Sequence, residues 1–276
     1  DIFFSLDDLG NIYFYDTERY DLLWKTTAQS YNAEETDYFL WGYFLDQDRV
    51  VLASPDTFYV LNVKDRNCEQ MIASENMKNY VEQPAAVYKN ILAVSYETDG
   101  SIRLYDLEQG SAASSFTCSD MEDSVAEMEN TVSSLRFSED GRRLAVGMER
   151  SAWSMSDVQY DNLFVFDCAT GEQIASFYEN SIVQLEFVGT DKLALITYNI
   201  PENAAFDIMY YEYEYENKVL DISTSKTMWN SEKYRYSSQF DNIDKGIENI
   251  GSFSVNGEML PVVVFYNKSS LEAVDI

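Results

Sequence analysis

The feature that most constrains the fold of this chain is a repeated group of four short β-type runs. The clearest copy extends from Val132 to Phe177, with runs at 132–138, 143–148, 162–167 and 173–177. Turn residues such as "SEDG" and "ATGE" bound these runs, which is typical of successive hairpins. Further copies occupy 38–73, 85–117 and 182–222, and partial copies occupy 1–26 and 247–276. Most copies are about 45 residues long.

Four antiparallel strands at this period are the sequence mark of a propeller blade. Aligning the copies places the ends of their third strands at Asp16, Val63, Asp106, Asp167, Glu212 and Asp275. We label the strands of one blade a, b, c and d in chain order. The sequence therefore predicts an all-β fold, a β-propeller of four-stranded antiparallel blades with about six to eight blades, and the alternative is a β-sandwich.

The ends of several third strands resemble a known repeat. "YFYD", "RLYD", "FVFD" and "EAVDI" resemble the Trp-Asp ending of WD40 repeats, and "SEDG" and "ETDG" resemble the turn between that family's inner strands. The chain is identified as a divergent, bacterial WD40-like propeller that lacks the Gly-His motif. The resemblance implies a platform for binding other proteins. We expect one domain over 1–276, excised from a longer chain.

Composition excludes several kinds of site. The chain has 48 acidic and 19 basic residues, a formal charge of −29, and no histidine. Such a charge repels nucleic acid and anionic lipid, and the lack of imidazole excludes Ser-His-Asp triads and histidine-ligated zinc. The cysteines are Cys68, Cys118 and Cys168, an odd number without a CxxC pair, and are expected to be structural thiols. We expect no cofactor, no metal and no insertion of these residues into a membrane.

The lengths of the connections predict where a ligand binds. Because strands alternate in direction, the a–b and c–d turns lie at one end of each blade, and the b–c and d–a connections lie at the other. We call these the short-turn end and the long-loop end, since the long segments are 74–84, 118–131, 149–161, 199–206 and 223–246. Long loops are often functional.

Aromatic and charged residues of these loops are the predicted site. They are Trp153, Met155, Asp157, Tyr160, Trp229, Tyr234, Arg235 and Tyr236. Aromatic, Met and Arg side chains are common in interface hot spots. The alternative for Trp153 and Trp229 is that each folds back over the edge of a blade.

A stripe of alternating tyrosine and glutamate in "YYEYEYEN", 210–217, raises a separate question. The alignment places it at the end of a third strand, at the short-turn end, with "EYEN" as the c–d turn. Successive side chains of a strand point to opposite faces, so the carboxylates are expected to meet water. We interpret the stripe as structural, and the alternative is a recognition strip.

Two classes of function remain open. The leading hypothesis is a non-catalytic ligand-sensing or protein-interaction propeller, the extracellular part of a bacterial membrane-anchored protein, and an intracellular or cytoplasmic scaffold competes with it. Its partner would be a protein or peptide, or a small polar or cationic ligand. The second hypothesis is a glycan-binding or glycan-hydrolysing propeller with paired carboxylates. No motif selects such a pair, so we expect no enzyme activity.

Overall fold

A computed structural model shows a chain built almost entirely of β-strands. It describes residues 1–7, 9–32, 38–74, 84–96, 101–117, 131–149, 161–199, 212–237, 246–255, 258–267 and 270–275. One short 3₁₀ turn, Ala28–Ser30, interrupts the strands in these ranges. No helix in the same ranges is long and apolar enough to cross a membrane.

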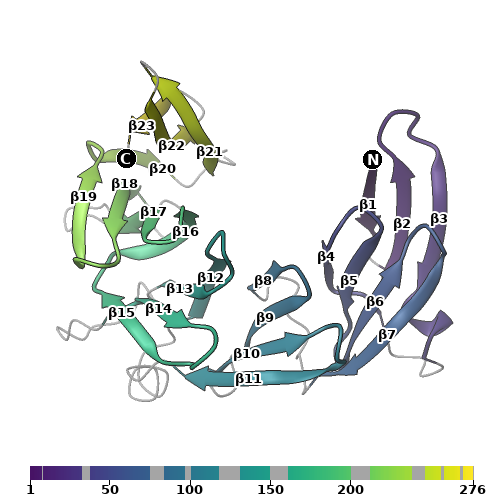
Figure 1. The fold of residues 1–276 in the computed structure, drawn as a ribbon. Helices are drawn as coiled ribbons and strands as arrows, with labels where there is room; N and C mark the ends of the chain where they lie inside the picture. Colours follow the sequence, from purple (N-terminus) through teal and green to yellow (C-terminus); the bar gives the residue numbers. More distant parts are fainter. Residues whose placement is uncertain are drawn as a thin grey trace. The chain divides into compact units, whose positions relative to one another are not determined.

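The described strands form six sheets in which consecutive strands are neighbours, except that β20 of the fifth sheet pairs with β18 (Figure 1). Every pairing with a defined register is antiparallel. The sheets are β1 (Ile2–Leu6), β2 (Asn11–Asp16) and β3 (Leu22–Thr27); β4 (Trp41–Phe44), β5 (Arg49–Ala53), β6 (Thr57–Asn62) and β7 (Asn67–Ala73); β8 (Ala85–Tyr88), β9 (Ile91–Tyr96), β10 (Ser101–Asp106) and β11 (Ser111–Thr117); β12 (Thr131–Phe137), β13 (Arg143–Glu149), β14 (Leu163–Asp167) and β15 (Gln173–Phe177); β16 (Ser181–Val188), β17 (Lys192–Asn199), β18 (Glu212–Asp221), β19 (Lys226–Asn230) and β20 (Tyr234–Ser237); and β21 (Gly246–Val255), β22 (Glu258–Asn267) and β23 (Ser270–Asp275).

The strands gather into two compact units. Unit 1 comprises 1–83, 87–96 and 102–115, and unit 2 comprises 84–86, 97–101 and 116–276. In unit 1 the first sheet packs Ile12 and Phe14 against Leu52 and Tyr59 of the second. Apolar side chains on both faces of the inner strands are what stacked sheets require.

Unit 2 is held together in the same way. Leu163 and Val165 of β14 pack against Leu185 of β16 and Leu195 of β17. Gly147 of β13 allows this close approach, because a Cβ there would come within 2.7 Å of the Leu185 side chain. The rigid packing of β12 and β13 on β16 positions the candidate site described below.

A repeated side-chain turn marks the end of the third strand in most sheets. The Oδ1 atoms of Asp16, Asp106 and Asp167 each accept hydrogen bonds of 2.8–2.9 Å from the backbone amides two and three residues further on. Asn62 and Asp221 accept the bond from the third amide in their own turns, at 2.9 and 2.8 Å. Short polar side chains stabilise turns by this local bond.

This turn corrects two positions of the sequence alignment. The predicted third-strand ends at Val63 and Glu212 are wrong, because the turn-forming side chains are Asn62 and Asp221. Strand β18 continues for ten residues from Glu212, so "EYEN" lies inside a strand and is not a turn. The glutamates suggested a solvated turn, but the aspartate that forms one comes later in the sequence.

The Asp167 turn should contribute to stability above acidic pH. Hydrogen bonds from the amides of Thr170 and Ala169 hold the pKa of the Asp167 carboxyl below its usual value of 3.8. A carboxyl with a lowered pKa stabilises the fold above its unfolded pKa, and this contribution is lost as pH falls through the folded pKa. We expect Asp167→Ala to lower Tm at pH 7.

Thermal unfolding of Asp167→Ala at pH 7 and at pH 3 checks this prediction. The difference in Tm from the unsubstituted chain should shrink at pH 3, which is below the usual aspartate pKa of 3.8, because the contribution of the turn decreases as pH falls toward the folded pKa. Glu172→Ala is the matched control, since Glu172 is an exposed acid of the same turn region. An equal loss for both variants, or a loss that does not change with pH, would show that the turn bond is unimportant.

The described cysteines are inert thiols. Cys68 and Cys168 are unbridged and partly buried. Burial raises the pKa of the Cys168 thiol to about 12, and the nearby carboxylates of Asp167 and Asp140 act in the same direction. Burial also raises the pKa of Cys68. Because the thiolate is the reactive form, neither side chain is set up for redox or nucleophilic chemistry. Cys118 lies outside the described residues.

Candidate functional site

The first strands of two neighbouring sheets of unit 2 carry a β-bulge near the long-loop end. The register of β12 shifts between Val132 and Ser134, and that of β16 shifts between Ile182 and Gln184. The hydroxyl of Ser133 donates to the Ile182 carbonyl at 2.6 Å and so joins the two bulges. Bulges redirect side chains and are frequent beside functional sites.

The bulge in β16 leaves an apolar side chain in water. Val183 is 42% exposed, although its neighbours Ile182 and Leu185 are fully buried. Tyr178, which lies in the connection that leads into β16, is 46% exposed. Val183 on β16 and Tyr178 in the connection before it are therefore both exposed at the long-loop end.

Strand β18 extends beyond a normal blade at this same end. Its residues 218–221 pair with β19, and residues 212–215 pair with the additional strand β20 (Figure 1). Ser231 joins the two halves: its backbone N–H donates to the Asn217 carbonyl at 2.9 Å, and its hydroxyl accepts from the Asn217 amide at 3.0 Å. We call β17, the first half of β18 and β20 the ribbon.

Covered charges fix the base of the ribbon. The ammonium of Lys218 lies 2.7 Å from the carboxylate of Glu179 and 3.4 Å from that of Glu216. These three side chains are 17%, 7% and 12% exposed, respectively. Lys233 pairs with Glu214 at 3.1 Å. Charged side chains that are largely removed from water are tolerated only when they are paired in this way.

The pairing keeps Lys218 charged. Burial lowers the pKa of its ammonium, but the hydrogen bond from Lys218 to Glu179 and the charges of Glu179 and Glu216 outweigh burial, so the pKa is raised above the usual 10.5. A lysine with a raised pKa stabilises the fold fully below its unfolded pKa, and this contribution is lost only as pH rises through the folded pKa. The cluster is therefore intact at neutral pH.

The glutamates of the tyrosine stripe do not face open water, contrary to the sequence expectation. Glu214 and Glu216 have side chains that are 16% and 12% exposed, because each is covered and paired with a lysine. The predicted place of the stripe is also wrong. In the register of β17 and β18, Asn199 lies opposite Glu214, so the stripe begins β18 at the long-loop end.

The tyrosines of the stripe form the other side of the ribbon. The ring of Tyr198 lies 5.0 Å from that of Tyr213 and 5.8 Å from that of Tyr215. The hydrophobic cluster that contains Tyr215 also contains Phe265 of β22. The tyrosines therefore pack the ribbon onto the protein and are not an exposed strip.

Buried polar atoms without partners also lie at the long-loop end. In the described part of the chain these atoms are Trp41 Nε1, Ser74 Oγ and Asn199 Oδ1. Trp41 begins strand a of its sheet, Ser74 follows strand d of the same sheet, and Asn199 ends strand b of another. Buried polar groups in proteins are normally hydrogen-bonded, so these three atoms are exceptions within the described residues.

Only part of the predicted site can be placed. Trp153, Met155, Asp157 and Tyr160 lie outside the described residues. Trp229 lies in β19 and stacks on Phe265 of β22 at 5.5 Å. The backbone register brings Tyr234, Arg235 and Tyr236 opposite Tyr215, Glu214 and Tyr213.

The predicted loop at 223–246 is partly wrong. It contains β19 and β20, because the strand ending was placed nine residues too early at Glu212 instead of Asp221. The described residues also lack any group of three or more histidine, cysteine or acidic side chains that could hold a metal ion. The exposed bulge at Val183 has no sequence signal, whereas Lys218 could have been noticed as a lone cation between acidic and apolar residues.

Comparisons with known proteins agree on the fold. A chain of the mitotic checkpoint complex matches 97% of this chain over 72% of its own, with TM-score 0.58 and 12% identity. The WD40 domain of Pan2 from Neurospora crassa matches 83% of this chain with TM-score 0.52 and 13% identity. Hydrazine synthase of Kuenenia stuttgartiensis matches 84% with TM-score 0.50 and 12% identity.

These similarities show a propeller-type fold. The chain spans 63% and 61% of the hydrazine synthase and Pan2 chains, respectively. No protein-family model and no curated protein sequence matches it. The number of blades, predicted as six to eight, stays a prediction. At these identities the comparisons establish architecture, and the function has to be argued from the site.

Proposed function

We propose that this propeller-type chain binds a protein or peptide partner at the long-loop end of unit 2, over Val183, Tyr178 and the ribbon. The observation that carries the proposal is the bulge in β16, which holds an apolar side chain in water on a strand whose other apolar residues are buried. A partner that covers Val183 and Tyr178 would remove apolar surface from water at a rigid place.

The charge cluster supports docking by pre-organising this surface. Lys218 is held from both sides by Glu179 and Glu216, and Ser231 fixes the bend between β19 and β20. A surface that is already ordered loses little conformational entropy when a partner binds. The acidic balance of the whole chain, −29, favours a partner with a basic rim.

The same cluster gives little support to glycan hydrolysis. Glu179 and Glu216 form a carboxylate pair, as such a mechanism requires, but both contact one ammonium and are mostly covered. In a glycoside hydrolase the two carboxyl groups flank the scissile bond, whereas the ammonium of Lys218 lies against both of these carboxylates. We therefore propose a binding role for this end. That the chain senses a ligand outside the cytoplasm stays a prediction.

Site-specific photo-crosslinking in the native cell tests the proposal. A photoreactive amino acid replaces Val183 in one variant and Ile174 in a second; Ile174 is 44% exposed and lies at the short-turn end of β15. We expect position 183 to crosslink a discrete partner that position 174 does not. Equal products from both positions, or products from position 174 alone, would contradict a binding surface at the long-loop end.

A further inference from the structure

The bulge at Val183 belongs to a series that recurs in three consecutive sheets of unit 2. The first strands β12, β16 and β21 each shift their register against the second strand of their sheet. The extra residue is Ser133 in β12 and Val183 in β16. Two residues further on, Leu135 and Leu185 are both fully buried. Ser133 and Val183 therefore occupy equivalent places in neighbouring sheets.

In β12 the extra residue serves the fold. The hydroxyl of Ser133 donates to the Ile182 carbonyl of β16 at 2.6 Å, and it lies 3.2 Å from the Gly147 carbonyl of its own sheet. The bulged residue thus reaches the first strand of the next sheet and joins the two sheets. For β16 the corresponding neighbour is β21, which packs beside it.

Val183 cannot form such a bond, because its side chain has no hydrogen-bond donor. It is 42% exposed, so packing of β21 beside β16 leaves much of it in water. Apolar surface that stays in water contributes nothing to folding, whereas a serine at the equivalent place of β12 joins two sheets. The stability of the isolated protein gives no reason for a valine here. A complex that covers the side chain does.

The carboxylates at the base of the ribbon are already paired. Glu179, in the connection that leads into β16, and Glu216 lie 2.7 and 3.4 Å from the ammonium of Lys218. A basic rim can steer a partner toward this acidic chain, but a cation gains little from carboxylates that a lysine already neutralises. The feature left for a partner to recognise is the apolar surface of Val183 and Tyr178.

We propose that Val183 determines which partner binds at the long-loop end of unit 2, and that it selects a protein segment with an aliphatic or aromatic side chain. This inference rests on the proposed function and specifies its partner. An apolar side chain gains affinity by leaving water at Val183, whereas a polar or charged one loses hydration and receives no hydrogen bond from the valine. Single anchors of this kind often dominate the affinity of an interface.

Crosslinking from a neighbouring position tests the role of Val183. A benzophenone amino acid replaces Tyr178, an aromatic exchange at a residue that is 46% exposed. The yield of its product in the native cell is then compared with valine, threonine or isoleucine at position 183. We expect Val183→Thr, which replaces a methyl group with a hydroxyl, to lower the yield about fivefold, and Val183→Ile to keep it within about twofold. The Tm of Val183→Thr should not fall, because threonine suits a strand.

The product formed from a photoreactive residue at position 183 identifies the anchor. Mass spectrometry locates the partner residue to which position 183 is attached. We expect this residue, or its immediate neighbour in the partner sequence, to be aliphatic or aromatic. Attachment within a segment that has no such residue would overturn the inference.

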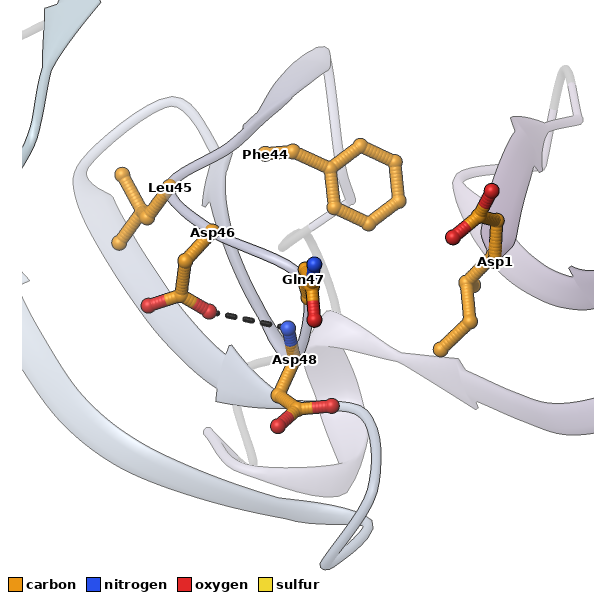
Figure 2. Close-up of a pocket in the computed structure, with 7 residues that line it drawn as sticks. Asp1, Phe44, Leu45, Asp46, Gln47 and Asp48 are labelled. Carbon is orange, nitrogen blue, oxygen red and sulfur yellow. Dashed lines mark hydrogen bonds between the residues drawn. The ribbon is translucent and has the colours of Figure 1, made fainter.

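Phe44 is the matched control position for the benzophenone. It is an aromatic residue of unit 1 that is 36% exposed, and it lines a cavity of about 530 Å³ between the start of β1 and the β4–β5 turn, at the short-turn end (Figure 2). Any product from position 44 should form in the same yield whichever residue occupies position 183. An equal fall in yield at positions 44 and 178 would overturn the inference.

The remaining outcomes separate this inference from the proposed function. A product from position 178 whose yield is the same with valine and with threonine at position 183 would overturn the selection of an apolar anchor, and the proposed surface would stand. The lack of any discrete product from positions 178 and 183 would overturn both.

Discussion

Replacing Lys218 with methionine is expected to lower the free energy of unfolding by about 3 kcal/mol at pH 7. Methionine fills similar space, so the main loss is the cation that Glu179 and Glu216 share. Removing one partner of a covered ion pair leaves the remaining charge without compensation, which costs far more than a surface pair contributes. For a chain of this size the change corresponds to a Tm lower by about 6–12 °C.

The pH dependence and a second substitution show whether unpaired carboxylates cause this loss. The Lys218→Met variant should recover relative to the unsubstituted chain as pH falls, because protonation removes the uncompensated charge. The double variant Lys218→Met/Glu179→Gln should be less destabilised than Lys218→Met alone. Lys226→Met, at an exposed lysine of β19, is the matched control. A loss no larger than that of the control would show that the cluster does not stabilise the ribbon.

Replacing Val183 with arginine is expected to weaken binding of the crosslinked partner by about tenfold or more. Val183 is 42% exposed, so arginine can be accommodated and the fold should persist. In a complex, however, the same side chain is expected at the centre of the interface beside Tyr178. A guanidinium there would be removed from water without a prepared counter-charge.

A matched substitution distinguishes a local effect from a change in net charge. Ile174→Arg adds the same cation at an exposed β-branched residue of unit 2, but at the short-turn end. Affinities of both variants can be measured by isothermal titration calorimetry, with Tm as a check on folding. We expect Ile174→Arg to bind like the unsubstituted chain. A similar loss for both, or a loss for Ile174→Arg only, would move the interface away from Val183.

The sequence predicted the sheets well because their signals are local. Turn residues such as Asp16, Asp106 and Asp167 act within three residues of their own position, so they can be recognised in the sequence. The error at Glu212 arose where a polar strand imitated a turn. Alternating glutamates normally indicate a solvent-exposed face, but here Glu216 pairs with Lys218 of the same strand, and Glu214 pairs with Lys233, which lies 19 residues further along the chain.

The candidate site was harder to predict from the sequence, because its residues come from segments that are distant along the chain. Glu179, in the connection between β15 and β16, and Lys218 of β18 are 39 residues apart in the sequence and meet only in the folded protein. The exposure of Val183 depends on a one-residue shift of register within an apolar run, which has no compositional mark. Tyr213 and Tyr215 were noticed, but which side of the strand they cover was decided by packing on the cluster of Phe265.

Hydrogen exchange of the complex with the crosslinked partner tests the central claim most directly, namely that the long-loop end of unit 2 is the binding surface. We expect the partner to slow exchange of amides in 181–184, 197–199 and 212–217. The c–d turns of the same sheets, 168–172 and 222–225, should exchange as they do in the free protein. Protection of those turns, with 181–184 and the ribbon unchanged, would contradict the claim.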